Sequence, residues 1–477
     1  MSEHAPKRPE LTDERHEFGI EEMFFSTTDA KGVITNANDV FVRISHYGED
    51  ELMGAPHNIL RHPEMPAAAF KFMWDELQAG RKFCAYVRNL AADGATYDVF
   101  ATVVPVGDSY LSVRTRPLRQ DLWDVVCEQY KATLDVEKAH RDGNSRHQVA
   151  VLGAQDLGAR VVSLGFSGVA DLCAQLLIAE VQEHSAQSSL LPDRPDATGA
   201  VGQLLHITRN IEGQVTGLIS RLEEYGALVA RLRAAHDDVA PTVQRVRDLR
   251  DAVHTGTDKL APDATENPTQ DSAGDAAAAS SSEETAALQE TLRHLAEVID
   301  DRVATALTGY ENLPDQLAEL AGAIDEMRAD IALLRLHNSM VGRLALELLD
   351  GKSTQAFTAV PLLCDALTEG ANRTASRVAK ARELTQAIPE ILSSAIAGVD
   401  RSRRQLNKWA GTTERFDNAQ DVAEEREYVE TQSQTGFDEL NELSALGAKC
   451  TFLTMPFDAD SMTANVAGIR GALEQLK

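Results

Sequence analysis

Hydrophobic and polar positions in the first 120 residues change spacing from one segment to the next, as in a mixed α/β domain. Alternating or β-branched and aromatic runs predict strands over 22–27, 33–35, 83–90, 96–106 and 110–116, separated by turn residues at 29–32, 92–94 and 107–108. Apolar residues three and four apart predict short helices over 38–45 and 67–78. This order predicts a five-stranded antiparallel sheet with helices packed on one face.

Beyond residue 121 the hydrophobic spacing is helical almost to the C-terminus. An apolar seam runs over 204–232, and a longer one runs over 288–348 and resumes over 360–406 after a turn at 351–354. Two helices of similar length joined by a turn predict an antiparallel hairpin. A hairpin leaves one apolar stripe exposed, so we expect a homodimer that completes a four-helix bundle.

Composition supports a division of the chain at about residue 120. Eight of the 14 phenylalanines precede that point, which indicates a compact aromatic core there. Residues 261–283 are rich in Ala, Ser and Asp and cannot bury a core. The predicted segments are a disordered N-terminal tail (1–20), an α/β domain (21–120), a helical and coiled-coil region (121–260), a low-complexity linker (261–283), the antiparallel hairpin (284–410) and C-terminal helices (411–477).

Charge and cysteine usage exclude several classes of function. A formal net charge of -28 argues against a surface for nucleic acid or a polybasic membrane anchor. The five cysteines form no CxxC pair and no metal-ligand spacing, so we expect no metal site and a reducing, cytoplasmic location. The N-terminus lacks the apolar stretch of a signal peptide. The apolar stretch 161–181 carries Asp171 and Gln175, which predicts a buried helix and no contact with a membrane.

Known catalytic motifs are missing from the sequence. We find no nucleophile elbow, phosphate-binding glycine loop or HExxH pattern, and the histidines of the helical region have no partner four residues away. We therefore expect no catalytic residues and no turnover enzyme.

The segment 55–66 carries two histidines and an arginine between three prolines. Proline fixes φ, so this loop should be stiff, and its polar side chains can face a ligand. Arg61 and His62 either bind an anionic or hydrogen-bonding ligand or bond the backbone near the following helix.

Aromatic and amide residues nearby also allow two readings. Trp74 and Phe83 either form the walls of a flat pocket or belong to the core. Asn38 and Asn89 can read the donor and acceptor edge of a ring, although Asn38 can equally cap the helix beginning at Asp39.

An ordered series of segments resembles the PAS domain of bacterial aerotaxis receptors: 26–29, 34–39, 54–66, 68–70, 73–74, 87–89 and 112–116. In that family the pocket holds FAD non-covalently, and a redox change of the isoalloxazine ring repositions the sheet against downstream helices. The resemblance implies FAD as the cofactor and a binding pocket formed by Asn38, His57, Asn58, Arg61, His62, Phe70, Trp74 and Asn89.

The sequence departs from this family at several positions. Glu64 stands where the family has Asp, while Phe83 and Asp98 each replace a Trp, and the final hairpin over 105–110 is shorter. We therefore expect the stacking and polarity of the pocket to differ from those of the aerotaxis receptors.

The helical remainder resembles, more faintly, the cytoplasmic hairpin of methyl-accepting chemotaxis proteins. Residues 331–338 are similar to the segment leading to the kinase-contacting tip, and 356–360 to the start of the return helix. The tip pattern itself is missing, because residues 341–347 read VGRLALE. The partners that this resemblance implies are a chemotaxis kinase and its coupling protein, with a degenerate tip.

Together these expectations describe a cytoplasmic sensor of redox or energy state. The PAS domain would sense through FAD, and a change in packing between the sheet and the helix around 122–130 would relay the signal to a protein partner. The alternative is a structural or scaffolding protein, in which an empty PAS domain serves for dimerisation and the helices serve for assembly.

Overall fold

The computed structural model describes residues 9–187, 191, 194–261, 276–352, 355–434, 438–452 and 454–477. The chain divides into two units. The first contains Met1–Ser220, Asp325–Val378 and Pro456–Lys477, and the second contains Arg221–Ile324 and Ala379–Met455.

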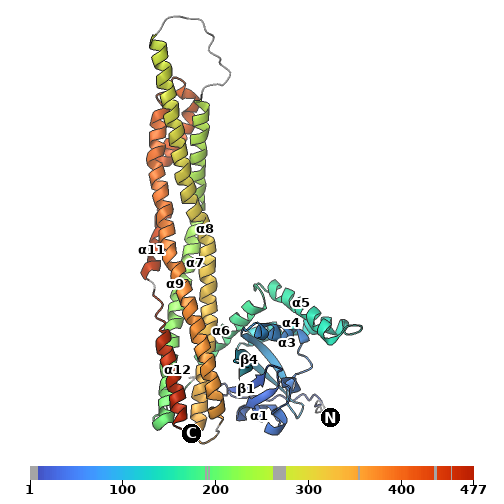
Figure 1. Ribbon diagram of the computed structural model, residues 1–477. Helices are drawn as coiled ribbons and strands as arrows, with labels where there is room; N and C mark the ends of the chain where they lie inside the picture. Colours follow the sequence, from blue (N-terminus) through green and yellow to red (C-terminus); the bar gives the residue numbers. More distant parts are fainter. Residues whose placement is uncertain are drawn as a thin grey trace. The chain divides into compact units, whose positions relative to one another are not determined.

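One antiparallel sheet lies in the first unit, with the strand order β2-β1-β5-β4-β3 (Figure 1). The described strands are β1 (Phe24–Asp29), β2 (Ile34–Ala37), β3 (Phe83–Leu90), β4 (Thr96–Val106) and β5 (Ser109–Thr115). Glycines at positive φ make the tight connections, Gly94 (φ 88°) between β3 and β4 and Gly107 (φ 57°) between β4 and β5. The predicted five-stranded sheet is confirmed, and β3 and β4 have the predicted bounds.

Short helices cover the first face of this sheet. They are α1 (Asp39–Ser45), α2 (Glu49–Leu52), the 3₁₀ helix η1 (His57–Leu60) and α3 (Ala67–Gln78). Phe24 of β1 stacks on Phe41 of α1 at 5.5 Å between ring centroids, inside a core that Leu52 and Leu60 complete. The proline-bounded loop holds a single 3₁₀ turn because proline disfavours a longer regular element.

The second face of the sheet is covered as well, which the prediction of helices on one face missed. The covering helices are α4 (Gln120–Ala139) and α6 (Val169–Gln187), while α5 (Arg146–Ser163) packs against α3 and α4. Tyr86 of β3 meets the ring of Trp123 in α4 at 5.2 Å, and its hydroxyl donates to Glu180 Oε1 of α6 at 2.6 Å. Tyr86 and Phe100 are buried on this face and meet edge to face, so this face also needs a cover.

The apolar stretch 161–181 is not one helix. It is shared between α5 and α6, which are separated by a turn at Gly165 (φ 94°). None of the described helices combines the length and the hydropathy that a membrane crossing requires.

The prediction of a disordered tail is wrong for residues 9–20. The backbone N–H of Thr12 donates to Gly94 O at 2.9 Å, and that of Thr96 donates to Glu14 O at 2.9 Å. A side chain at position 94 would place its Cβ 2.0 Å from Glu10 O, so glycine permits this close approach. Residues 1–8 of the predicted tail lie outside the described residues.

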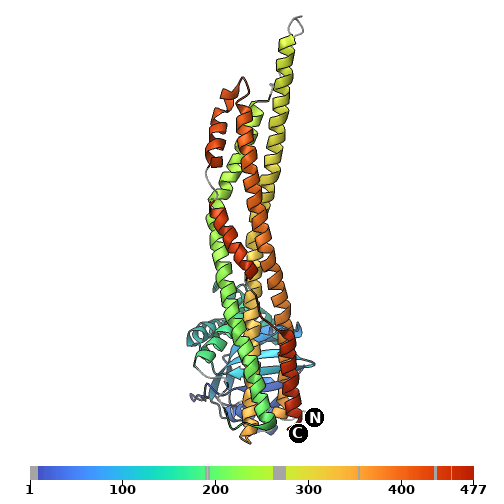
Figure 2. The same ribbon diagram turned by 90° about the vertical axis from the view of Figure 1, so that its left-hand side faces the viewer.

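Long helices form the remainder of both units (Figures 1 and 2). The described elements are α7 (Gly199–Lys259), α8 (Ala276–Leu349), α9 (Ala356–Thr413), η2 (Ala419–Val422), α10 (Ala423–Gln434), α11 (Asp438–Lys449), η3 (Cys450–Phe452) and α12 (Ala459–Glu474). Of the linker predicted at 261–283, residues 262–275 lie outside the described residues, and α8 begins before its predicted end.

Helices α8 and α9 pair antiparallel within each unit, as the hairpin prediction requires. In the first unit Gly370 of α9 faces the side chain of Leu334, and in the second unit Gly398 faces Ala306. Residue numbers therefore fall along α8 as they rise along α9, which is the register of an out-and-back hairpin.

Other helices of the same chain cover the stripe that the hairpin was expected to expose. In the first unit, Asn338 of α8 donates to Thr208 O of α7 at 2.8 Å. In the second unit, Trp409 Nε1 of α9 donates to Thr257 Oγ1 of α7 at 2.9 Å. A second copy of the chain is therefore not needed to bury this stripe, and the homodimer stays a prediction.

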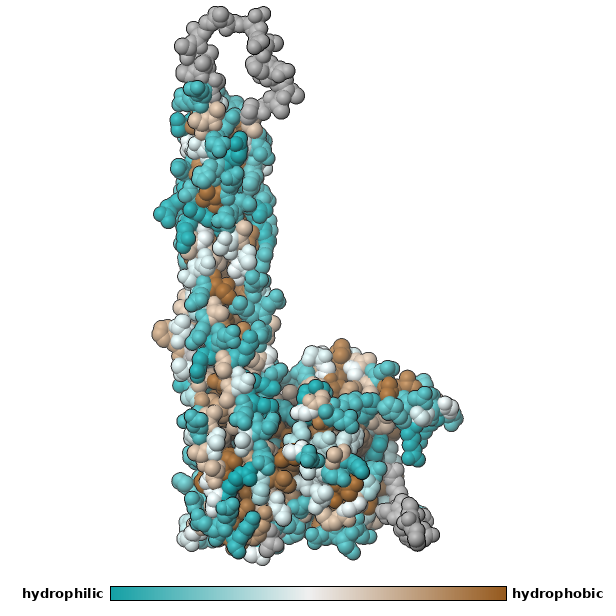
Figure 3. Space-filling view, viewed as in Figure 1, coloured by the Kyte–Doolittle hydropathy of each residue, from teal (hydrophilic) through white to brown (hydrophobic). Residues whose placement is uncertain are grey.

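The space-filling view shows a face that is mostly polar, with small separate apolar patches (Figure 3). Large hydrophobic side chains that are exposed among the described residues are few: Leu11, Val125, Val162, Leu164 and Phe452. The acidic net charge of -28 is spread over such a polar surface.

Candidate functional site

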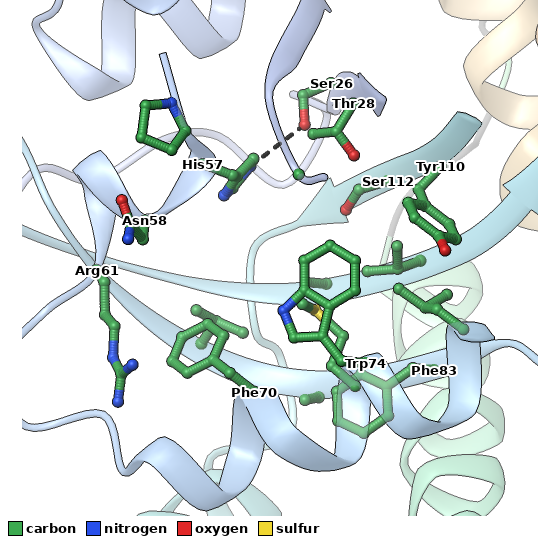
Figure 4. Close-up of a pocket in the computed structure, with 18 of the residues that line it drawn as sticks. Ser26, Thr28, His57, Asn58, Arg61, Phe70, Trp74, Phe83, Tyr110 and Ser112 are labelled. Carbon is green, nitrogen blue, oxygen red and sulfur yellow. Dashed lines mark hydrogen bonds between the residues drawn. The ribbon is translucent and has the colours of Figure 1, made fainter. Parts of the chain in front are cut away.

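A cavity of about 300 Å³ lies between the sheet and the helices of its first face (Figure 4). The elements that line it are β1, the turn before β2, η1, α3 and strands β3, β4 and β5. This volume lies at the lower end of the range for small-ligand sites. The lining is mostly apolar and includes one group of polar side chains that point toward the cavity.

Strand periodicity places the lining residues. Successive side chains of a strand point to opposite faces, so every second residue of each strand reaches the cavity. The strand residues in the lining are Ser26 and Thr28; Phe83, Ala85, Val87 and Asn89; Ala101 and Val103; and Tyr110, Ser112 and Arg114. Intervening residues such as Tyr86 face α4 and α6 instead.

Of the eight predicted cofactor-binding residues, the structure brings six together around the cavity: His57, Asn58, Arg61, Phe70, Trp74 and Asn89. Asn38 and His62 are not in the lining. In Figure 4 the rings of Phe70, Trp74 and Phe83 lie on one side of the cavity, and the hydroxyls of Ser26, Thr28 and Ser112 lie on the other.

Asn38 has a structural role. Its Oδ1 accepts from the backbone N–H of Phe25 at 3.2 Å and from that of Phe41 at 3.4 Å, and its Nδ2 donates to Met23 O at 3.3 Å. The side chain is fully buried and caps α1. Its amide joins the first strand to the first helix, and both its oxygen and its nitrogen are bonded to the backbone.

The loop residues Arg61 and His62 both bond the backbone, as one of the two sequence readings expects. Arg61 Nη2 donates to Met65 O at 2.9 Å, and the backbone N–H of Glu64 donates to His62 Nδ1 at 3.2 Å. Arg61 also lies over the ring of Phe70, 4.4 Å from its centroid, and belongs to the cavity wall. It therefore stiffens the loop and the aromatic wall together.

Arg114 is a residue of the cavity that the sequence reasoning did not select. Its side chain is buried, with only 5% of the residue exposed, and no carboxylate among the described residues pairs with it. Its Nη1 donates to Ser26 Oγ at 2.9 Å and its Nη2 to His57 Nε2 at 2.7 Å. Burial lowers the pKa of Arg114 to about 10, so the guanidinium remains charged at neutral pH.

His57 is held neutral by the same arrangement. Burial first, and the charge of Arg114 second, lower its pKa to about 3. Because a guanidinium only donates hydrogen bonds, His57 Nε2 must be the acceptor and the ring proton must sit on Nδ1. At Arg114 the cavity wall therefore carries a positive charge next to a neutral imidazole.

Two further residues of the lining, Ser112 and Trp74, are placed to contact a ligand. Ser112 Oγ is buried and has no hydrogen-bond partner among the described residues, a state that normally costs about 1–3 kcal/mol. Trp74 meets Tyr110 edge to face at 5.6 Å, and its indole lies against Gly32, where an added Cβ would come within 2.9 Å. The glycine thus allows the indole to form part of the wall.

Of the three residues that differ from the aerotaxis pattern, one lines the cavity and two do not. Phe83 lines the cavity, so the expected difference in stacking applies there. Glu64 and Asp98 do not line it, and both bind Arg88 instead, at 2.7 Å and 2.9 Å. The expectation that Asp98 alters the polarity of the pocket is wrong, because position 98 faces away from the cavity.

Arg114 leaves a signal in the sequence. The predicted strand alternates Leu111 and Val113 with Tyr110, Ser112 and Arg114. This period of two could have predicted that the arginine lies on the same face as the two hydroxyl groups. The sequence pattern does not tell whether a carboxylate pairs with this arginine. The folded domain shows none among the described residues.

These groups fit a flat, polar-edged aromatic ring such as isoalloxazine. Phe70, Trp74 and Phe83 offer aromatic walls, while Arg114, Ser112 and Asn89 offer polar atoms for a ring edge. A cation without a counter-ion favours a ligand that carries or gains negative charge.

Residues 23–117 match the family model described as PAS fold. Over 127 residues the chain is 39% identical to the aerotaxis receptor of Escherichia coli (strain K12), in a match that covers 26% of this chain and 24% of that receptor. The chain therefore shares a segment amounting to about a quarter of the length of this curated relative.

Solved structures with a similar fold include the light state of the blue-light photoreceptor Aureochrome1 LOV, at 23% identity and a TM-score of 0.21, covering 22% of this chain and 90% of that one. A Rhodobacter sphaeroides LOV protein is similar at 20% identity and a TM-score of 0.20, covering 30% of this chain and 86% of that one. A PAS domain from Colwellia psychrerythraea is similar at 20% identity and a TM-score of 0.17, covering 20% and 85%.

Proposed function

We propose that this protein is a cytoplasmic sensor of redox or energy state whose PAS domain binds FAD in the cavity described above. The observation that carries the proposal is the buried guanidinium of Arg114, which has no acidic partner among the described residues and lies in the wall of an aromatic-lined cavity. The choice of FAD among flavins rests on the resemblance to aerotaxis receptors.

The residues of the chain would hold the cofactor in defined ways. Phe70 and Trp74 would contact the faces of the ring, and Ser112, Asn89 and Arg114 would meet its polar edge. A bound flavin supplies reversible uptake of electrons, which adds negative charge to the pocket. Arg114 would stabilise that charge by up to ~4 kcal/mol at a separation of ~4 Å and an effective dielectric constant of ~20.

The change would reach the helices through the sheet. Arg114 is tied to β1 through Ser26 and to η1 through His57. On the opposite face, the hydroxyl of Tyr86 and the backbone N–H of Arg119 share the buried carboxylate of Glu180. A shift of the strands would therefore alter the packing of α4 and α6 against the sheet, the kind of two-state contact that packed helices allow.

The α8–α9 end of the first unit provides a route to a partner. Lys82, which precedes β3, is 2.5 Å from the buried carboxylate of Asp330 in α8. Residues 331–338, which resemble the segment before a kinase-contacting tip, are buried throughout except for the half-buried Arg335. Arg335 pairs with Glu212 of α7 at 2.5 Å.

We propose that this packing withholds residues 331–338 from a protein partner and that the redox change of the PAS domain loosens it. A chemotaxis kinase with its coupling protein is the partner class that the resemblance suggests. Within this proposal the protein relays a signal and does not turn over a substrate.

Spectroscopy of the purified full-length chain tests the sensor. We expect the flavin absorbance bands, their loss on reduction by dithionite, and release of about one FAD per chain on heating. A colourless preparation that also fails to take up added FAD would overturn the proposal and favour the scaffolding alternative with an empty PAS domain.

Hydrogen exchange tests the relay separately. Comparison of oxidised and dithionite-reduced protein should show faster exchange in residues 331–338 on reduction, with helix α5 as the internal control. Equal exchange in both states, in a protein that does bind FAD, would reject the relay and leave the sensor intact.

A further inference from the structure

A second cluster of chemically active side chains lies at the N-terminal edge of the PAS domain and is not used by the flavin proposal. It consists of His16, His46 and Asp93, whose ligand atoms all lie within 4.8 Å of one another. They come from three separate segments: the N-terminal stretch, the end of α1, and the β3–β4 turn.

The donor atoms converge on one point. His16 Nε2 is 2.8 Å and His46 Nδ1 is 2.9 Å from the same oxygen, Asp93 Oδ2. The two imidazole rings stack at 4.1 Å between centroids, 13° from parallel. Asp93 Oδ1 accepts from the backbone N–H of Ala95 at 3.1 Å, which fixes the orientation of the carboxylate.

Backbone hydrogen bonds hold the three segments in place. The N–H of His16 donates to Thr96 O at 2.8 Å, which places the N-terminal stretch beside the β3–β4 turn. The N–H of Ala92 donates to Ser45 O at 2.9 Å, which ties the end of α1 to the same turn. The cluster is therefore preorganised by main-chain contacts and not by the three side chains alone.

His46 adds a backbone observation. It is the C-cap of α1 with φ 57° and ψ 9°, and it alone among the described non-glycine residues has a positive φ. This left-handed conformation costs a residue with a Cβ about 1–2 kcal/mol. The conformation turns the imidazole of His46 toward Asp93, and such strained positions concentrate at ligand clamps.

We propose that His16, His46 and Asp93 bind a divalent transition-metal ion, with Zn²⁺ as the best match. Two imidazoles and one carboxylate are a ligand set that Zn²⁺ accepts, with water completing a tetrahedron. Metal–ligand distances of about 2.0–2.2 Å place tetrahedral ligand atoms ~3.3 Å apart, so the histidine nitrogens and Asp93 Oδ2 need to separate by only ~0.5 Å. The side chains of His46 and Asp93 are 45% and 36% exposed, which leaves room for water and for entry of the ion.

Binding would replace the hydrogen bonds that join the two imidazoles to Asp93 by bonds to the ion. Each coordinating nitrogen must be unprotonated, so a proton on His16 Nε2 or His46 Nδ1 moves to the other nitrogen of its ring, or leaves to solvent from a ring that carries two protons. No change in oxidation state is required. The ion would join the N-terminal stretch to α1 and the β3–β4 turn, and its occupancy would stabilise that stretch against opening.

Metal titration of the chelator-treated full-length chain tests this site. We expect about one Zn²⁺ per chain by competition with a chromophoric chelator, and at least ~10-fold weaker binding in His46→Asn and in Asp93→Asn. Asparagine suits both positions, because it tolerates the left-handed conformation at 46 and keeps an acceptor for Ala95 at 93. His147→Gln, which changes an exposed histidine on α5, should bind Zn²⁺ like the wild type.

Two further readouts keep the test decisive. Zn²⁺ should slow hydrogen exchange of residues 12–18 in the wild type but not in His46→Asn, and His16→Gln replaces that variant if it does not fold. Bound Co²⁺ should show ligand-field bands without thiolate charge transfer, since the cysteines are not ligands. Equal affinity in all variants, or a thiolate signal from Co²⁺, would overturn the site.

Discussion

Arg114 Nη2 lies 2.7 Å from His57 Nε2, so a buried guanidinium of strand β5 holds a neutral imidazole of η1 at the wall of the cavity. The contact joins a sheet residue to the proline-bounded loop. Since both side chains line the same cavity, charge that appears there acts on the sheet and on the loop together.

Replacing Arg114 by Gln should make the bound flavin harder to reduce. The variant removes the positive charge but keeps a hydrogen-bond donor, and each ~1.4 kcal/mol of lost stabilisation lowers a two-electron midpoint potential by ~30 mV. Spectroelectrochemical titration measures this shift. Arg116→Gln, an exposed arginine two residues further on, is the control and should leave the potential unchanged.

Arg61→Ala should weaken retention of the flavin during gel filtration. The change removes both the bond to Met65 O and the stacking on Phe70, so the loop and the aromatic wall lose a shared support worth about 1–2 kcal/mol. Arg81→Ala removes an exposed arginine that pairs only with Glu76 and should retain flavin normally. Unchanged retention in Arg61→Ala would return that residue to a purely structural role.

Gly32→Ala should disturb the cavity through Trp74. Gly32 has φ 77°, and an added Cβ would lie 2.9 Å from Trp74 Cζ2, so the indole must move. Gly80→Ala is the matched control, because Gly80 has φ 74° but no atom within 4 Å of the added Cβ. Both variants should lose about 1–2 kcal/mol of stability from the backbone, and only Gly32→Ala should change the affinity for FAD.

Asp330→Asn should destabilise the first unit strongly. The buried carboxylate is shared by Lys82 at 2.5 Å, by Arg373 at 3.5 Å and by Arg377. Arg373 and Arg377 keep Glu369 and Glu326 as partners, whereas the largely buried Lys82 loses its carboxylate, at a cost of about 3–5 kcal/mol. Urea unfolding of the full chain measures the loss. Lys71→Met, which removes a surface pair with Asp75, should cost less than ~1 kcal/mol.

Glu347→Gln should stabilise the protein at neutral and alkaline pH. Burial, together with the nearby charge of Asp39, raises the pKa of Glu347 to about 7 from an ordinary value of 4.5. The folded protein therefore takes up a proton, and the stability that this provides is full below pH ~4.5 and lost as the pH rises through ~7.

The glutamine variant lacks this loss. Its advantage over the wild type should grow between pH ~4.5 and ~7 and level off at about 1–2 kcal/mol, after allowance for a side chain that is only partly buried. Thermal unfolding at a series of pH values measures it. The exposed Glu474→Gln serves as control, and a pH-independent difference in Glu347→Gln would contradict the assignment.

Local pattern was sufficient for the bounds of several elements of the PAS domain. The bounds of α3, β3 and β4 agree with the expected 67–78, 83–90 and 96–106, because side-chain periodicity and turn residues act over a few neighbouring positions. The same periodicity put Asn89 on a strand and Trp74 on a helix, where both meet the cavity.

Tertiary structure decided what depends on distant segments. Asn38 caps α1 and does not line the cavity. Two of its hydrogen bonds join residues 13 and 15 positions earlier in the chain, and the third joins the first turn of α1. Helix α7 covers the apolar stripe of the hairpin, where Asn338 donates a hydrogen bond to Thr208 O. Heptad spacing in α8 predicts a helical partner but does not tell whether that partner belongs to the same chain or to a second copy.

The sequence by itself therefore determined where most elements of the PAS domain form, since each element depends on the order of residues within it. Only the folded domain decided that Arg114 lies apart from every carboxylate of the described residues, and that His16 and His46 both contact Oδ2 of Asp93. Electrostatic and ligand geometry are set by distances in space between residues up to 88 positions apart in the chain, and no local spacing encodes those distances.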